Sequence, residues 1–137
     1  MADIEKIGLL VICENNILLC RKKYGTSKLI LPGGRIEPGE TPIECLRREL
    51  SEELGEVRVT DLTFIGTYED IAHFDDPTVK KTLRLQLYGG TLEGTPVPSN
   101  EISKLIWFGP MSDHSELTPI FNRTILPDLK TRKILNW

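Results

Sequence analysis

The spacing of apolar residues along the chain is typical of a protein built mainly from short strands. The clearest alternation runs over residues 82–88, where Leu83, Leu85 and Leu87 fall on one face. Shorter apolar runs, separated by polar or Gly-rich segments, predict further strands. These strands cover residues 7–13, 17–20, 29–31, 57–68 and 105–108, with a hairpin turn at 14–16 between the first two.

One segment has both the spacing and the end signals of a helix. Thr41 can act as the N-cap, Pro42 suits the first helical position, and Glu44 completes a capping box. Gly55 fits the position just past the end, where a left-handed residue is favoured. The sequence therefore predicts a helix over residues 42–54, about 20 Å long at ~1.5 Å per residue. Its core-facing stripe would be Ile43, Leu46, Leu50 and Leu54.

The C-terminal part of the chain predicts a second helix. It would cover residues 118–129, and Pro127 would limit its length. Strands interleaved with a central and a terminal helix indicate an α/β fold, with a mixed sheet covered by helices. No linker or repeat divides the chain, so residues 1–137 are expected to form a single domain.

Composition and charge narrow the possible functions. The net charge is −3, so the overall field favours neither polymeric nucleic acid nor an acidic membrane. The longest apolar run, residues 7–13, is far shorter than the ~20 residues that span a bilayer. Three cysteines without zinc-site spacing favour a reduced, cytoplasmic protein. A free nucleotide remains compatible with this charge, because it needs only a local site.

The predicted helix carries a cluster of like charges. Glu49, Glu52 and Glu53 share one face, and each like-charge pair at this spacing costs a few tenths of a kcal/mol. One interpretation is a solvated acidic face, in which Arg48 reaches Glu44 and Glu52. The other is a set of hard oxygen ligands for Mg²⁺ or Mn²⁺. The glycine turn just before the helix supports the second interpretation, because a glycine lets backbone approach a ligand closely.

These residues match the Nudix box, G-x5-E-x7-R-E-U-x-E-E-x-G-U, in which U is aliphatic. The only departure is the last position, which is Glu56. The chain therefore resembles the Nudix family, and the resemblance implies a Nudix-type α/β/α sandwich with a central mixed sheet. The matching positions are Gly34, Glu40, Arg48, Glu49, Leu50, Glu52, Glu53 and Gly55, and Gly33 precedes them in the turn.

The resemblance implies hydrolysis of a pyrophosphate bond in a compound that contains a nucleoside diphosphate. Glu49, Glu52 and Glu53 would hold Mg²⁺, or Mn²⁺, with help from the Gly34 carbonyl. Arg48 would orient the glutamates, and Glu40 would support the loop before the helix. The general base would be Glu53, with Glu52 as the second candidate in the box. Glu101, just before the strand at 105–108, is a candidate outside the box, although a surface carboxylate is equally compatible with its position.

The small size resembles the MutT-like branch, which converts a (d)NTP into the monophosphate and pyrophosphate. Asn122 would read the base and Phe121 would stack on it, although an ordinary helix residue and a core aromatic are the simpler interpretations. Arg21 would face the phosphates, or belong to a solvated strand edge. Other Nudix substrates stay open as alternatives: a nucleotide sugar, ADP-ribose or a dinucleoside polyphosphate. A non-catalytic nucleotide-binding regulator is the alternative of another class, and the sequence leaves monomer or homodimer open.

Overall fold

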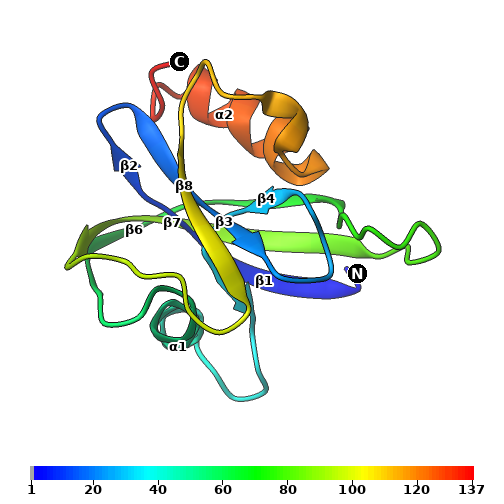
Figure 1. Ribbon diagram of the computed structural model, residues 1–137, viewed down its shortest axis with the longest axis horizontal. Coiled ribbons are helices and arrows are strands. Elements are labelled where there is room, and N and C mark those ends of the chain that lie inside the picture. The colour runs from blue at the N-terminus through cyan, green and yellow to red at the C-terminus, as the bar shows by residue number, and fades with distance from the viewer. Residues whose placement is uncertain (1) are drawn as a thin grey trace.

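The computed structural model describes residues 2–137 as strands held between two helical layers. Helix α1 lies on one side of the strands, and η2 with α2 lies on the opposite side (Figure 1). The elements in chain order are β1 (Ile4–Leu10), β2 (Ile12–Cys13), β3 (Asn16–Lys22), β4 (Leu29–Ile30), β5 (Gly33–Arg35), α1 (Pro42–Leu54), β6 (Arg58–Ile71), β7 (Thr82–Glu93), β8 (Ile102–Phe108), η1 (His114–Glu116), η2 (Ile120–Ile125) and α2 (Leu126–Thr131). This layering confirms the predicted α/β/α sandwich.

Residues 2–137 form two four-stranded sheets rather than one. The first has the order β5-β1-β7-β6 and is mixed, because β1 pairs parallel with β7 and antiparallel with β5. In the second, β3 pairs antiparallel with β2, β4 and β8. The turn between β2 and β3 has Glu14 and Asn15 at positive φ, as a tight hairpin turn requires. The predicted strand at 7–13 is thus divided between β1, which begins at Ile4, and the short β2.

Helix α1 begins and ends where the sequence predicts. The Thr41 side chain accepts from the Glu44 N–H, the Glu44 side chain accepts from the Thr41 N–H, and Gly55 follows the helix at φ 75°. One face of the helix packs against β1 and β3 through a cluster of buried side chains. That cluster includes Ile7, Leu9, Val11, Leu18, Cys20, Cys45, Leu46, Leu50, Leu54 and Ile102. The capping signals therefore fix the register in which the other face of α1 presents its glutamates.

The β6–β7 hairpin is longer than the sequence pattern indicates. Strand β6 continues to Ile71 and β7 to Glu93, so Gly89 and Gly90 lie inside a strand instead of ending it. A Cβ at Gly90 would lie 2.8 Å from Val59 Cγ1 on the paired strand, so glycine serves packing at this position. Two register shifts in this pair explain the imperfect alternation seen in the sequence.

The predicted C-terminal helix at 118–129 is confirmed in place by η2 and α2, which together cover residues 120–131, but its first half is not an α-helix and Pro127 does not limit its length. A π-helix, η2, comes first, and its last turn closes with a bond from the Leu126 N–H to the Phe121 carbonyl. Pro127 then lies in the first turn of α2 and does not end the helix, which continues to Thr131. The side chains of Ile120, Phe121, Ile125, Leu126 and Leu129 pack in the second core cluster, with Leu29 and Leu87.

Within residues 2–137, no helix has the length and hydrophobicity needed to cross a membrane.

Candidate active site

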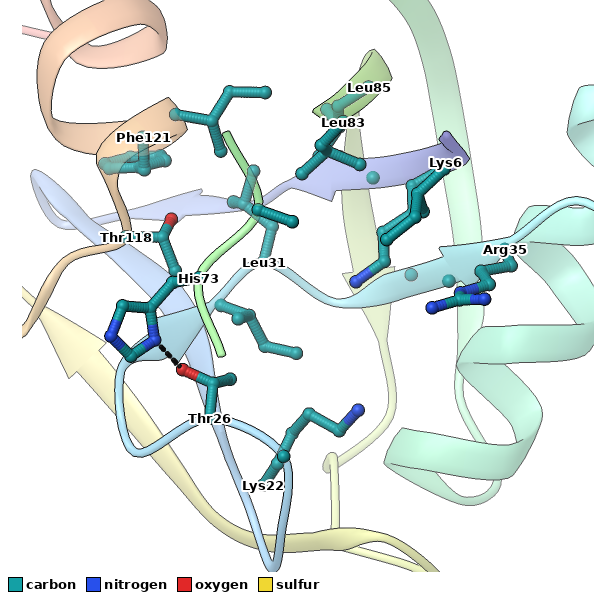
Figure 2. A pocket seen from close by; sticks show the side chains of 18 of the residues that line it. Lys6, Lys22, Thr26, Leu31, Arg35, His73, Leu83, Leu85, Thr118 and Phe121 are labelled. Carbon is teal, nitrogen blue, oxygen red and sulfur yellow. Dashed lines mark hydrogen bonds between the residues drawn. The ribbon is translucent and has the colours of Figure 1, made fainter. Parts of the chain in front are cut away.

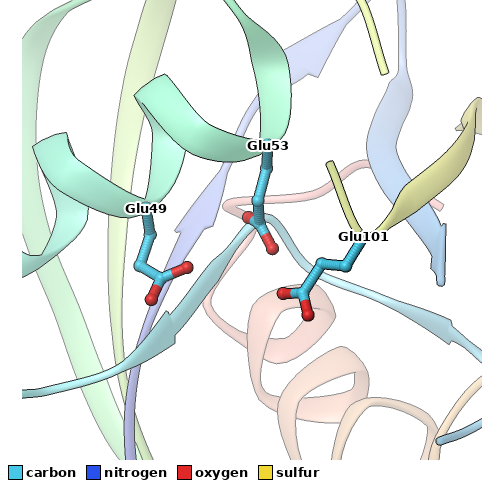
Figure 3. A group of neighbouring side chains, drawn as sticks. All are labelled: Glu49, Glu53 and Glu101. Atoms are coloured by element: carbon cyan, nitrogen blue, oxygen red, sulfur yellow. The ribbon is translucent and has the colours of Figure 1, made fainter. Parts of the chain in front are cut away.

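A cavity of about 300 Å³ is lined by residues of both sheets and both helical layers. Figure 2 shows Lys6, Lys22 and Arg35 around one part of it, and Leu83 and Phe121 around another. The carboxylates of Glu49, Glu53 and Glu101 line the same cavity as these cations; the three acids are drawn in Figure 3. The cavity therefore has a charged end and an apolar end.

Three carboxylates meet at the charged end of the cavity. Glu49 and Glu53 project from α1, and Glu101 faces them from the segment that leads into β8 (Figure 3). One oxygen of each lies within 4.8 Å of the others. Hard oxygen donors at this spacing fit a divalent cation such as Mg²⁺ or Mn²⁺. The two acids of α1 are one helical turn apart, so their convergence follows directly from the helix.

Glu53 is the most deeply buried of the three acids. It is 2% exposed, whereas the side chains of Glu49 and Glu101 are 12% and 36% exposed. The Gly33 N–H donates to Glu53 Oε1 at 2.8 Å. Burial, with smaller contributions from the charges of Glu49 and Glu101, raises the pKa of Glu53 to about 8. Burial also raises the pKa of Glu49. A cation among these acids would relieve both effects.

Arg48 fixes the orientation of Glu49. Its Nε and Nη2 donate to the two oxygens of Glu40, at 2.6 and 2.9 Å, and its Nη1 donates to Glu49 Oε1 at 2.9 Å. The bidentate pair lowers the pKa of Glu40 to about 2. The predicted contact of Arg48 with Glu44 is wrong, because Glu44 is engaged in the capping box with Thr41. Arg48 therefore links the loop before α1 to an acid of the cavity.

Gly33 and Gly34 have to be glycines because neighbouring atoms occupy the space that a Cβ would need. Gly33 has φ 136°, and a Cβ there would lie 2.0 Å from the carbonyl oxygen of Ile7. A Cβ at Gly34 would lie 2.3 Å from the Glu49 carboxylate carbon. Only glycine leaves space for that carboxylate against the backbone of β5.

The loop before β8 brings Glu101 to the acids of α1. The Asn100 side-chain amide donates to the Glu52 carbonyl at 2.7 Å, and the Ser99 N–H donates to the Glu53 carbonyl at 3.0 Å. These bonds cap the C-terminal turn of α1, where carbonyls lack helical partners. Glu101 is thus placed by helix capping, although it lies far from Glu53 in the sequence.

The apolar end of the cavity is formed by side chains from several separate segments. Leu31, Leu83 and Phe121 line it, together with the half-buried Phe74. Its rim contains a hydrogen bond between Thr26 Oγ1 and His73 Nδ1, 2.5 Å long, which joins two loops (Figure 2). A planar apolar group, such as a nucleobase, suits such a wall.

Comparison with known proteins agrees with the geometry of the charged end. The family model for the NUDIX domain matches residues 5–129. The chain belongs to the Nudix family. An 8-oxo-dGTP diphosphatase from Proteus vulgaris is 36% identical over 80 residues, which cover 53% of this chain and 68% of that protein. An RNA pyrophosphohydrolase from Tolumonas auensis is 33% identical over 61 residues, 44% of this chain, and the match spans only 34% of that protein's length. The solved structure of the E. coli ORF135 protein superposes with a TM-score of 0.72 at 21% identity, covering 97% of this chain and 93% of that one, and so shares the fold.

The acids of the Nudix box do not all face the cavity. The side chain of Glu52 is 52% exposed to solvent. Its Oε1 forms an ion pair with Arg48 Nη1 at 3.6 Å. The third carboxylate beside Glu49 and Glu53 is instead that of Glu101. The assignment of Glu52 as a metal ligand stays a prediction, since its carboxylate lies on the solvent side of the helix.

Of the three predicted substrate-binding residues, Phe121 lines the cavity, and Asn122 and Arg21 do not. Phe121 lines the cavity, whereas Asn122 is exposed and is not among the lining residues. Arg21 is bound to Glu116, at 2.7 Å, and to the carbonyl of Ser27. The roles of Asn122 and Arg21 therefore stay predictions with no contact to the cavity that would support them.

Several residues that line the site of this Nudix protein lie outside the motifs of the sequence. Lys6 and Arg35 lie at the charged end, and Thr26 and His73 lie at the rim. For Lys6 a signal existed, because Lys6 and its neighbour Glu5 are the two charged residues of a strand, β1, whose other residues are apolar or glycine. The position of Arg35 depends on sheet pairing, which the pattern does not encode.

Proposed function

We propose that the chain is a metal-dependent Nudix pyrophosphohydrolase that converts a nucleoside triphosphate into the monophosphate and pyrophosphate. The observation that carries this proposal is the meeting of Glu49, Glu53 and Glu101 at one end of a cavity whose other end is apolar. A nucleoside triphosphate has the same division, with dense charge at one end and a flat apolar base at the other.

Glu49, Glu53 and Glu101 are the proposed ligands of Mg²⁺, with Glu52 and the Gly34 carbonyl as further candidates from the box. When bound there, the metal would screen the phosphate charge and acidify a water molecule. Arg48 would keep Glu49 turned toward the cavity through its bond to Oε1. The bond from Gly33 to Glu53 Oε1 leaves the second Glu53 oxygen free to face the cavity.

Glu53 is the proposed general base, and Glu101 is the candidate outside the box. Both line the cavity, so each can reach a water molecule placed between the phosphates and α1. Glu53 would accept the proton of the attacking water while Gly33 holds its other oxygen. The fixed position of that carboxylate would reduce the reorganisation needed in the transition state.

A single nucleotide suits the volume of the cavity, about 300 Å³. The names of the relatives point to two forms of substrate, a free nucleoside triphosphate (8-oxo-dGTP) and RNA. We place the free nucleotide first, because the net charge of −3 offers no broad basic surface for a polymer. The protein would then act in the cytoplasm as a monomer or homodimer.

The proposal is tested by release of pyrophosphate or phosphate from a panel of compounds with Mg²⁺. The panel contains (d)NTPs, 8-oxo-dGTP, ADP-ribose, a nucleotide sugar, a dinucleoside polyphosphate and a 5′-triphosphorylated RNA. We expect turnover of a triphosphate that Glu53→Gln reduces by about 10²- to 10⁴-fold, the range for loss of a general base. Glu56→Gln removes an equally charged but exposed side chain just past the helix and is the matched control.

Each result of the panel has a defined meaning. Preferred turnover of ADP-ribose, a nucleotide sugar or a dinucleoside polyphosphate would overturn the triphosphate assignment and retain the hydrolase. Absence of turnover in the wild type across the panel, with nucleotide binding retained, would instead indicate a nucleotide-binding regulator. Equal loss in Glu53→Gln and Glu56→Gln would remove Glu53 from the mechanism.

A further inference from the structure

The charged end of the cavity contains a lysine, Lys6, that forms no ion pair with any of residues 2–137. Lys6 lies on β1 between Ile4 and Gly8, which line the same cavity. An unpaired ammonium group at a partly buried position is unfavourable unless a ligand compensates it.

Two of the neighbours of Lys6, Lys22 and Arg35, add positive charge beside it. In the β1–β5 pair, Lys6 lies directly opposite Arg35, and like charges at opposed positions of a sheet destabilise the pair. Burial lowers the pKa of Lys6, and the charges of Lys22 and Arg35 lower it further. Lys22 has a carboxylate neighbour, Glu101, but at 3.9 Å that contact is long. Three cations therefore converge on one region of a chain whose net charge is negative.

The position of Lys6 identifies the part of a substrate that it would meet. On one side are the acids Glu53 and Glu101, whose charges raise its pKa against the larger opposing effects. On the other side, Leu83 and Leu85 pair with β1 opposite Ile4 and Lys6 and line the apolar part of the cavity. Figure 2 shows the Lys6 side chain extending from β1 toward that of Lys22. A group held here would lie between the metal-binding acids and the nucleoside.

We propose that Lys6, assisted by Lys22, binds the phosphate that joins the nucleoside to the cleaved pyrophosphate linkage. The proposal rests on the function proposed above, and it assigns a specificity role to a residue outside the Nudix box. Lys6 would recognise a phosphorylated nucleoside over an unphosphorylated one, because an ammonium binds a phosphate dianion and gains little from a neutral sugar.

The test compares Lys6→Met with Lys23→Met, using dGTP, dGMP and deoxyguanosine. Methionine keeps most of the length of the side chain and removes the charge, while Lys23 is exposed and does not line the cavity, so its variant is the charge-matched control. We expect Lys6→Met to weaken dGMP binding by about ten- to a hundred-fold, the range for a charge-assisted bond. Deoxyguanosine binding should be unchanged in Lys6→Met, and all three ligands should bind Lys23→Met as they bind the wild type. Lys6→Arg should recover most of the dGMP affinity.

A second measurement separates phosphate binding from a purely electrostatic role beside the acids. If Lys6 only compensates Glu53 and Glu101, Lys6→Met will bind Mn²⁺ more tightly in the absence of nucleotide and leave dGMP affinity unchanged. That result overturns the proposal, as does an equal loss for dGMP and deoxyguanosine. Circular dichroism of each variant checks the fold, and Lys6→Gln replaces Lys6→Met if the latter does not fold. dGMP binding is measured without turnover, so a loss of affinity in Lys6→Met supports the proposal even if the wild type hydrolyses no triphosphate.

Discussion

The two ends of the cavity are built by different means. At the charged end, hydrogen bonds from Arg48 and Gly33 fix the acids Glu49 and Glu53, which lie one turn apart on one helix. At the apolar end, Leu83 and Phe121 come from β7 and η2, and their side chains are held by packing in the apolar core. The charged end is therefore suited to a fixed chemical step, whereas the apolar end can change its shape, and its substrate, through substitutions that leave the acids untouched.

This contrast predicts the largest effect for a small change at the charged end. In Gly34→Ala, the added Cβ would lie 2.3 Å from the Glu49 carboxylate carbon, so Glu49 must leave its position. We expect kcat to fall by about 10²-fold or more, in line with displacement of a group that acts in the transition state. Affinity for Mn²⁺, measured by calorimetry, should fall in parallel.

Gly39→Ala is the control for Gly34→Ala. Gly39 lies in the loop between β5 and α1, with φ +83° and open space around it, so its substitution lowers stability without touching an acid. If both variants lose kcat equally, the effect comes from the loop and not from Glu49, and the charged end is less dependent on close packing than we argue.

A change at the apolar end should act mainly on KM. Phe74 is half-buried and lines the cavity, so Phe74→Ala removes contact area for the bound nucleoside. We expect KM to rise by about five- to tenfold, the effect of losing 1–1.4 kcal/mol of apolar and aromatic contact, with kcat within about twofold of the wild type. Phe64→Ala removes an equal ring from β6 at a side chain 52% exposed and should leave both constants unchanged. A fall in kcat with an unchanged KM would show that the two ends do not act separately.

The same division decides how much could be predicted from the sequence. The caps of α1 and the spacing of Glu49 and Glu53 are local, so their placement follows from residues 41–55 alone. Lys6 and Arg35 meet because β5 pairs with β1, and Phe121 reaches the cavity through a π-helix that the pattern predicted as an ordinary helix. Those features depend on contacts between segments distant in the chain, which periodicity does not report.

The place of Glu101 in the site could be predicted from the sequence only in part. Its position before a strand could be read from the sequence, but its approach to Glu53 depends on the bonds from Ser99 and Asn100 to the end of α1. A polar Ser-Asn pair before an acid is common in loops, so it gave no signal of helix capping at a distance. The sequence could therefore name Glu101 as a candidate, but its meeting with the acids of α1 depends on contacts between distant segments.

The smallest effect on activity is expected from a substitution at the contact between η2, which carries Phe121, and β6. Asp70 accepts hydrogen bonds from Arg123 and Thr124 of η2, and the Arg123 bond holds its pKa well below the ordinary 3.8. A carboxylate with a lowered folded-state pKa contributes stability above its unfolded pKa and loses it as pH falls through the folded value. Asp70→Asn should therefore lower the free energy of unfolding by about 1–2 kcal/mol at pH 7, a range reduced for the exposed arginine. The difference from the wild type should shrink as the pH falls below 3.8.

Urea unfolding at pH 7 and pH 3 measures this difference. Asp61→Asn, at an exposed position of the same strand, removes the same charge and should change the free energy of unfolding little at either pH. The kcat of Asp70→Asn should stay near that of the wild type, because the acids on α1 do not depend on η2. A pH-independent loss of stability would show that packing, and not the ionised Asp70, attaches η2. A large loss of kcat would show that the charged end depends on the layer opposite α1.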